Sequence, residues 1–137
     1  MNYYLAILVA IIANMVLGFI WYGPLFGQLF MKACGISEKE IAKMKAEKQG
    51  MGKKEFATII LGALAQSAVL ATVLAWYQPT SWMIGAMVGS LLWLGFTLPA
   101  LAYTVVFEKH STTLFRIDSM YQLVALSIMG AILTVLI

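Results

Sequence analysis

Residues 3–22 read YYLAILVAIIANMVLGFIWY, an apolar stretch without a charged side chain. A helix needs about 20 mostly apolar residues to cross the hydrocarbon core of a bilayer. The stretch has that length and lacks the alternation of a membrane β-strand, so it predicts a transmembrane α-helix. A secretory signal peptide has a basic start and an apolar run of about 7–15 residues. Because this stretch has neither, we interpret it as a retained helix.

Three further stretches have the same character, at residues 56–77, 82–107 and 113–136. Aromatic side chains collect at the ends of the first three stretches, where amphipathic rings favour the headgroup level. The sequence therefore predicts an all-α integral membrane protein with four transmembrane helices in a bundle. The aromatic residues at these ends are Tyr3, Tyr4, Trp21, Tyr22, Trp76, Tyr77 and Trp82.

The composition of the whole chain agrees with this class. Of 137 residues, 62% are hydrophobic and 11% are charged, and the mean hydropathy is +0.89. Soluble domains are typically about 45–50% apolar and about 25% charged. The values exclude an ordinary soluble domain, a disordered chain and a nucleic-acid-binding domain, and the length predicts a single membrane domain over residues 1–137.

The basic residues lie on one side of the predicted spans, although the net charge is only +3. Seven of the nine lie in the loop 24–55, and the other two are Lys109 in the connection 108–112 and Arg116 at the start of the fourth span. The connection 78–81 and both termini hold none. The positive-inside rule places the two basic loops in the cytoplasm, so both termini are expected outside. The bilayer is the expected partner, and no nucleic acid is expected.

The loop 24–55 predicts helices outside the bilayer core. Pro24 is expected to end the first span, and residues 25–33 suit a short helix in the membrane interface. Ser37 and Glu40 form a capping-box pattern that predicts a polar helix over residues 38–48. This interfacial or cytoplasmic segment is either a solvated loop or a contact surface for a protein or an anionic lipid.

Few polar side chains interrupt the spans, and such residues are the main functional candidates in a membrane protein. Asn14 and Gln66 lie midway along the first two spans, and Thr97 lies near Pro99, which predicts a kink. Two interpretations stay open for all of them. They either hydrogen-bond neighbouring helices or line a polar path.

The fourth span carries an ionisable candidate, Asp118, near its start. Tyr121 and Gln122 share its face at spacings of three and four residues. Arg116 of a neighbouring copy, Lys109 or Tyr103 is the expected partner of Asp118. The residue is either a structural lock or a site.

Small residues repeat at spacings of four in the spans, as at Gly85 and Gly89 or at Ala10, Asn14 and Gly18. Such stripes let helices approach closely in lipid. They predict close packing, and we expect a homo-oligomer.

Several segments resemble a bacterial family called domain of unknown function 1761. They are GFIWYGPLFGQLFMK at 18–32, WLGF at 93–96, FEK at 107–109, FRIDSMYQLV at 115–124 and MGAIL at 129–133. The resemblance implies a small four-helix protein of the bacterial cytoplasmic membrane and implies no activity. The residues that belong to its pattern are Trp21, Tyr22, Gly23, Pro24, Asp118 and Tyr121.

The chain offers no pattern typical of an enzyme. With one cysteine, Cys34, and one histidine, His110, it has no nucleophile–base pair, metal cage or phosphate loop. We therefore expect no catalysis, cofactor or metal site. The leading hypothesis is a homo-oligomeric conduit or transporter for a small solute or ion. The alternative is a non-transporting subunit, scaffold or lipid-binding module that acts through the loop 24–55.

Overall fold

The computed structural model describes residues 3–46, 53–109 and 111–137. No strand occurs among these residues, and four helical stretches are long and apolar enough to cross a membrane, at Tyr3–Leu25, Phe56–Tyr77, Trp82–Phe107 and Thr112–Leu136. The predicted all-α class with four membrane helices is confirmed. In chain order the elements are α1 (Tyr3–Ile20), the π-helix η1 (Trp21–Leu25), α2 (Gly27–Ala33), α3 (Glu38–Ala46), α4 (Lys53–Tyr77), α5 (Trp82–Leu92), the π-helix η2 (Trp93–Thr97), α6 (Leu98–Phe107) and α7 (Thr112–Leu136).

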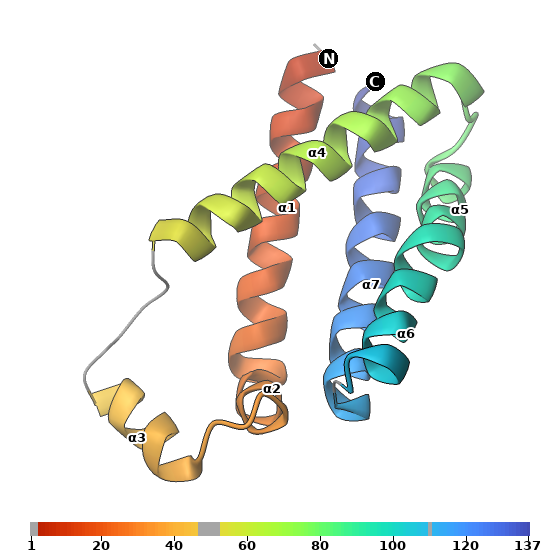
Figure 1. Ribbon diagram of the computed structural model, residues 1–137. Helices are drawn as coiled ribbons and strands as arrows, with labels where there is room; N and C mark the ends of the chain where they lie inside the picture. Colours follow the sequence, from red (N-terminus) through yellow and green to blue (C-terminus); the bar gives the residue numbers. More distant parts are fainter. Residues whose placement is uncertain (1–2, 47–52, 110) are drawn as a thin grey trace.

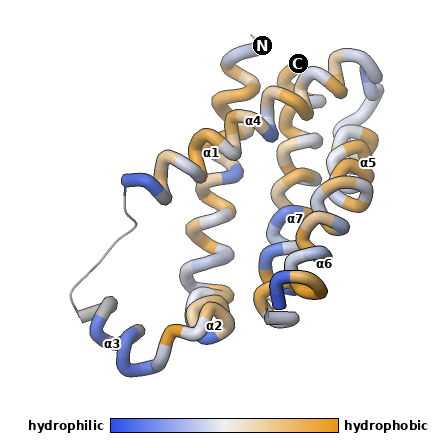
Figure 2. The backbone as a smooth tube through the Cα atoms, in the orientation of Figure 1, coloured by the Kyte–Doolittle hydropathy of each residue, from blue (hydrophilic) through white to orange (hydrophobic). Residues whose placement is uncertain are grey.

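The helices surround α7, which packs against α1, α4, α5 and α6. Figure 1 shows α1 and α7 running alongside each other, with α4 crossing them obliquely and its first turns diverging from α1. Both termini lie at one end of the bundle, and α2 and α3 lie at the other. Figure 2 shows hydrophilic positions concentrated on α3 and at the starts of α4 and α7, with single hydrophilic positions within the apolar helices.

The core occupies the half of the bundle that holds the termini. Small side chains allow α4 to lie close to its neighbours there, and Ala63, Ser67 and Ala71 of the predicted stripe are at most 2% exposed. Such close approach supplies much of the packing energy in lipid, where apolar burial gives little driving force. The buried cluster consists of Ala6, Ile7, Ala10, Leu70, Ala71, Leu74, Leu126, Met129 and Leu133.

Glycines bring α5 into direct backbone contact with α7. A methyl group added at Gly89 would overlap the carbonyl of Leu126, and one added at Gly85 would overlap Thr134. The hydroxyls of Ser90 and Ser127 hydrogen-bond across the same interface at 2.8 Å. The predicted small-residue stripe of the third span therefore packs within the chain.

Both prolines inside the spans lie in or beside a π-helix. Proline has no N–H to donate to the carbonyl four residues back, and beside each of these prolines another residue's N–H donates to the carbonyl five residues back, as in a π turn. Phe26 N–H donates to the Trp21 carbonyl at 2.9 Å around Pro24, and Leu98 N–H donates to the Trp93 carbonyl before Pro99. The first span ends at Leu25, one residue after Pro24, so Pro24 lies at its end as expected, within the π-helix η1.

The described part of the loop 24–55 is helical, as predicted. Gly35 ends the segment after α2 with a φ of 87°, which glycine adopts without strain. The Ser37 hydroxyl then accepts from the N–H of Glu40 at 3.2 Å and caps α3. The structure describes α3 as far as Ala46, and the predicted end of this helix at residue 48 lies outside the described residues.

Replacing Gly89 with alanine tests the close contact of α5 with α7. Because the added methyl group would overlap the Leu126 carbonyl, we expect the free energy of unfolding to fall by about 1–3 kcal/mol. The measurement is SDS-induced unfolding in mixed micelles. The matched control is Gly62→Ala in α4, where nothing lies within 4 Å of the added atom and alanine favours the helix by about 1 kcal/mol. Equal stability of the two variants would contradict the contact.

Candidate functional site

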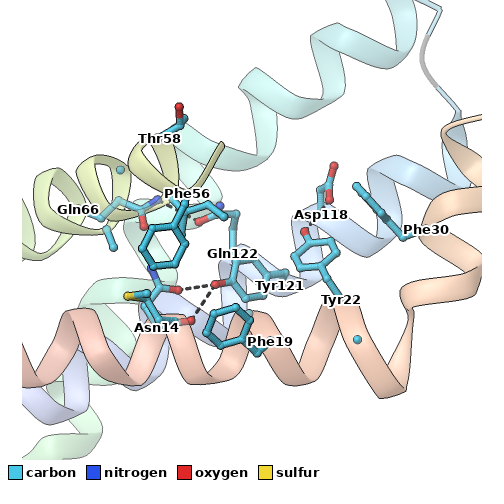
Figure 3. A pocket seen from close by; sticks show the side chains of 16 residues that line it. Asn14, Phe19, Tyr22, Phe30, Phe56, Thr58, Gln66, Asp118, Tyr121 and Gln122 are labelled. Atoms are coloured by element: carbon cyan, nitrogen blue, oxygen red, sulfur yellow. Dashed lines mark hydrogen bonds between the residues drawn. The ribbon is translucent and has the colours of Figure 1, made fainter. Parts of the chain in front are cut away.

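The first half of α7 presents three polar side chains toward α1 and α4. Asp118, Tyr121 and Gln122 follow one another at helical spacing, and each forms a hydrogen bond to a different residue of the preceding helices. Polar groups at membrane depth are costly unless they have hydrogen-bonding partners. This face therefore fixes how α1 and α4 lie on α7 (Figure 3).

Tyr121 joins α7 to the middle of α1. Its hydroxyl lies 2.5 Å from Oδ1 of Asn14 and 3.0 Å from the backbone oxygen of the same residue. Asn14 is only 7% exposed, so the phenol reaches it through a narrow gap. Gly18 opens that gap, because a methyl group there would lie 3.1 Å from the Tyr121 hydroxyl.

Tyr22 joins the end of the first span to Asp118. Its hydroxyl donates to Oδ1 of the carboxylate at 2.6 Å, a short bond typical of an ionised acceptor. The ring of Tyr22 also packs edge-on against Tyr121, with centroids 5.2 Å apart, and against Phe30 of α2 at 4.9 Å. Sequence reasoning named Arg116, Lys109 or Tyr103 as the partner of Asp118 and missed Tyr22.

Gln66 joins α4 to the same face of α7. Its side-chain N–H donates to Oε1 of Gln122 at 3.0 Å. Gln66 lies one turn beyond Gly62 on α4, and Figure 3 shows it beside Gln122. The pair therefore joins α4 to α7 within the membrane-spanning part of both helices.

Two tryptophans fix the backbone on either side of Asp118. The indole N–H of Trp21 donates to the carbonyl of Ile117 at 3.1 Å, and that of Trp93 donates to the carbonyl of Ser119 at 2.7 Å. Each tryptophan is the first residue of a π-helix. The two distorted segments therefore hold the site from opposite sides of α7.

A cavity of about 700 Å³ opens between α1, α4 and α7 beside these bonds. Ligand pockets commonly have volumes of about 300–1,000 Å³, with mostly apolar walls and a few polar groups. This cavity fits that description, since its polar groups gather along α7 and aromatic rings cover its other sides (Figure 3). The residues that line it are Asn14, Met15, Gly18, Phe19, Tyr22, Gly23, Phe30, Phe56, Thr58, Ile59, Gly62, Ala63, Gln66, Asp118, Tyr121 and Gln122.

The structure brings together most of the candidate residues. Asn14, Gln66, Asp118, Tyr121 and Gln122 line the cavity, as do Tyr22 and Gly23 of the WYGP turn. Their binding role stays a prediction. Thr97 lies apart from them in η2 and is not among the described lining residues, while Trp21 supports the backbone of α7 and Pro24 shapes η1.

Sequence reasoning missed the aromatic wall of the cavity, formed by Phe19, Phe30 and Phe56. Isolated phenylalanines in apolar segments carry no signal of their own. Tyr22 and Asp118 both belong to the pattern of the family resemblance, but that pattern does not indicate that the two residues are paired.

The electrostatic effect of Asp118 extends to the loop-bearing end of the molecule. Cys34, which follows α2, has a raised pKa because partial burial and the charge of Asp118 both disfavour its thiolate. The thiol is free and exposed. A raised pKa makes it a weaker nucleophile than an ordinary surface cysteine at neutral pH.

The fold and the cavity together define a small all-α integral membrane protein with a polar-lined cavity among its helices. The chain belongs to the family described as Protein of unknown function (DUF1761), which matches residues 5–134. The resemblance seen in the sequence is thereby confirmed. No curated protein and no solved structure matches the chain.

Replacing Gln66 with leucine tests the hydrogen bond between α4 and α7. The single variant leaves the Gln122 amide without its donor, so we expect the free energy of unfolding to fall by about 1 kcal/mol. Gln66→Leu combined with Gln122→Leu removes both amides and should recover most of that loss. SDS-induced unfolding in mixed micelles gives the comparison, and a double variant no more stable than the single one would contradict the pairing.

Proposed function

We propose that the protein is a conduit or transporter that carries a small amphipathic solute through the cavity between α1, α4 and α7. The observation that carries the proposal is the gathering of seven polar side chains from three spans on the wall of one cavity, namely Asn14, Tyr22, Thr58, Gln66, Asp118, Tyr121 and Gln122. A purely structural polar lock has no need of an open volume next to it. A carrier needs polar groups and an open volume beside them, since its solute must leave water and find polar contacts within the membrane.

The position of the cavity suits a solute that enters from the loop-bearing end. Phe30 belongs to α2, and Phe56 and Asp118 lie near the starts of α4 and α7. We propose that this end faces the cytoplasm of a bacterial cell, because the described parts of the basic loops 24–55 and 108–112 belong to it. Both termini then lie outside, at the packed end of the bundle.

The proposed role is not enzymatic, because the lining offers a single carboxylate and no nucleophile–base pair among the described residues.

We also propose that copies of the chain associate in the bilayer. Four helices leave little room for a pore along the axis of one bundle, and chemical cross-linking in native membranes would report the association.

A cysteine placed at Gly62 tests whether the cavity is open to water. Nothing lies within 4 Å of a side chain added there, and Gly62 lines the cavity. In a Cys34→Ser background, we expect Gly62→Cys to react with membrane-impermeant methanethiosulfonates of either charge. A transporter that exposes the cavity alternately should react when the reagent is added to either face of sealed vesicles.

The matched control is Leu61→Cys, one residue away on α4. Leu61 is 64% exposed and is not a lining residue, so its replacement should face lipid, where a thiol does not ionise and reacts slowly. We expect its rate to be at least about tenfold lower. Reaction of Gly62→Cys from one face alone would contradict passage through the cavity, and reaction from neither face would contradict an open cavity.

The non-transporting alternative has its own support in α3. Its charged residues Glu38, Lys39, Glu40 and Lys43 are exposed, and they suit a partner protein or an anionic lipid surface. If the protein acts by binding a partner protein or an anionic lipid through α3, deletion of residues 38–46 should abolish partner co-purification or vesicle binding. The same deletion should leave the Gly62→Cys reaction unchanged.

A further inference from the structure

We propose that the solute is an uncharged amphipathic molecule that carries a carboxamide group, held by the side-chain amides of Asn14, Gln66 and Gln122. This inference rests on the proposed function and names its substrate class. Three properties of the cavity lead to it: the amide groups that the helices leave unbonded, the engagement of its carboxylate within the protein, and its apolar surface.

Three side-chain carboxamides from three different helices line the cavity (Figure 3). Asn14 belongs to α1, Gln66 to α4 and Gln122 to α7. Each carboxamide carries an N–H₂ group that donates and an oxygen that accepts. The wall can therefore offer donors and acceptors together to one solute.

Each amide uses only part of its hydrogen-bonding capacity within the chain. Oδ1 of Asn14 accepts from the Tyr121 hydroxyl, and Oε1 of Gln122 accepts from the Gln66 N–H. Among the described residues, no bond engages Nδ2 of Asn14, Nε2 of Gln122 or Oε1 of Gln66. These atoms are not sealed in, since Ser67 Oγ is the one fully buried polar side-chain atom without a partner in the described part of the chain. The lining therefore presents two amide nitrogens and one amide oxygen to a solute.

A carboxamide on the solute complements these three groups. Its oxygen accepts from the N–H groups of Asn14 and Gln122, and its own N–H donates to the oxygen of Gln66. A ketone or an ester keeps the acceptor but lacks the donor. Either would leave the Gln66 oxygen without a bond inside the membrane, where an unpaired polar group is costly.

The rest of the lining favours a solute without a charge. Asp118 is the one carboxylate among the described lining residues. It accepts from the Tyr22 hydroxyl at 2.6 Å and takes part in a further interaction, so its charge is engaged within the protein. A charged solute would give up its hydration in a medium where an unpaired charge is costly, and an uncharged solute avoids that cost.

Apolar surface in the cavity suits the body of the solute. Phe19 of α1 is 55% exposed and Phe56 of α4 is 40% exposed, so both rings keep free surface, and both line the cavity. Such rings pack against other aromatic groups in offset or edge-on arrangements. A volume of about 700 Å³ is large enough for a bicyclic aromatic body with its carboxamide.

Binding of 2-naphthamide and 2-acetonaphthone tests the inference. The two molecules share their rings and carbonyl group, and a methyl group in the ketone replaces the amide nitrogen. Equilibrium dialysis of the purified full chain, with the same non-ionic micelles on both sides of the dialysis membrane, measures both affinities. We expect the wild-type protein to bind the amide about tenfold more tightly. Equal affinities would overturn the inference, and this comparison needs no variant.

Two ions with the same rings test whether the solute is uncharged. They are 2-naphthoate, an anion, and protonated 2-naphthamidine, a cation. We expect each to bind about tenfold more weakly than 2-naphthamide, because each brings a charge into the cavity. Binding of either ion as tightly as the amide would overturn the uncharged class.

Gln66→Leu combined with Gln122→Leu removes the amide oxygen and one of the nitrogens, and it should reduce the preference for the amide over the ketone to about twofold or less. The matched control is Ser90→Ala combined with Ser127→Ala. It removes a bonded polar pair between α5 and α7 outside the cavity lining and should retain the full preference. A preference that survives the glutamine double variant would overturn the inference. If Gly62→Cys reacts from both faces while the amide is not preferred, the substrate class is wrong and the conduit stands.

Discussion

The polar face of α7 is the constraint on which the rest of the structure depends. Asp118, Tyr121 and Gln122 lie within a span that also has to be apolar, and each must find a hydrogen-bonding partner there. Tyr22 and Asn14 of the first span and Gln66 of α4 are those partners. These bonds fix the positions of α1 and α4 along α7 more specifically than apolar contact does in lipid.

The two halves of the bundle differ because α4 meets two kinds of surface on α7. Near the termini, small residues let the helices touch, and Leu70, Ala71 and Leu74 of α4 are almost completely buried. Toward its start, α4 meets long polar and aromatic side chains, and its first turns diverge from α1 (Figure 1). The cavity follows from that separation, and the π-helices place Trp21 and Trp93 where they hold the backbone on either side of Asp118.

The sequence predicts the fold well because its signals are long and local. Each of the four apolar runs is one continuous segment, and the glycines of the third span and the Ser37 cap each lie within one or two turns. Contacts between helices are harder to predict, since nothing in the spacing of Asp118 indicates that Tyr22 reaches it across 96 positions. The position of Pro24 at the end of the first span was predicted, but the π-helix that contains it was not. The candidate polar residues were recognised individually, whereas the cavity and the place of Thr97 outside it depend on tertiary structure.

The bond between Tyr121 and Asn14 tests the central claim most directly, through a double-mutant cycle with Tyr121→Phe and Asn14→Ala. Unfolding in SDS mixed micelles gives the four free energies, and the cycle isolates the pair from the effects of each single change. The structure predicts a coupling energy of about 1 kcal/mol or more, at the upper end of hydrogen bonds within membranes. A coupling energy indistinguishable from zero would contradict the claim that the bond between Tyr121 and the Asn14 side chain positions the first span on α7.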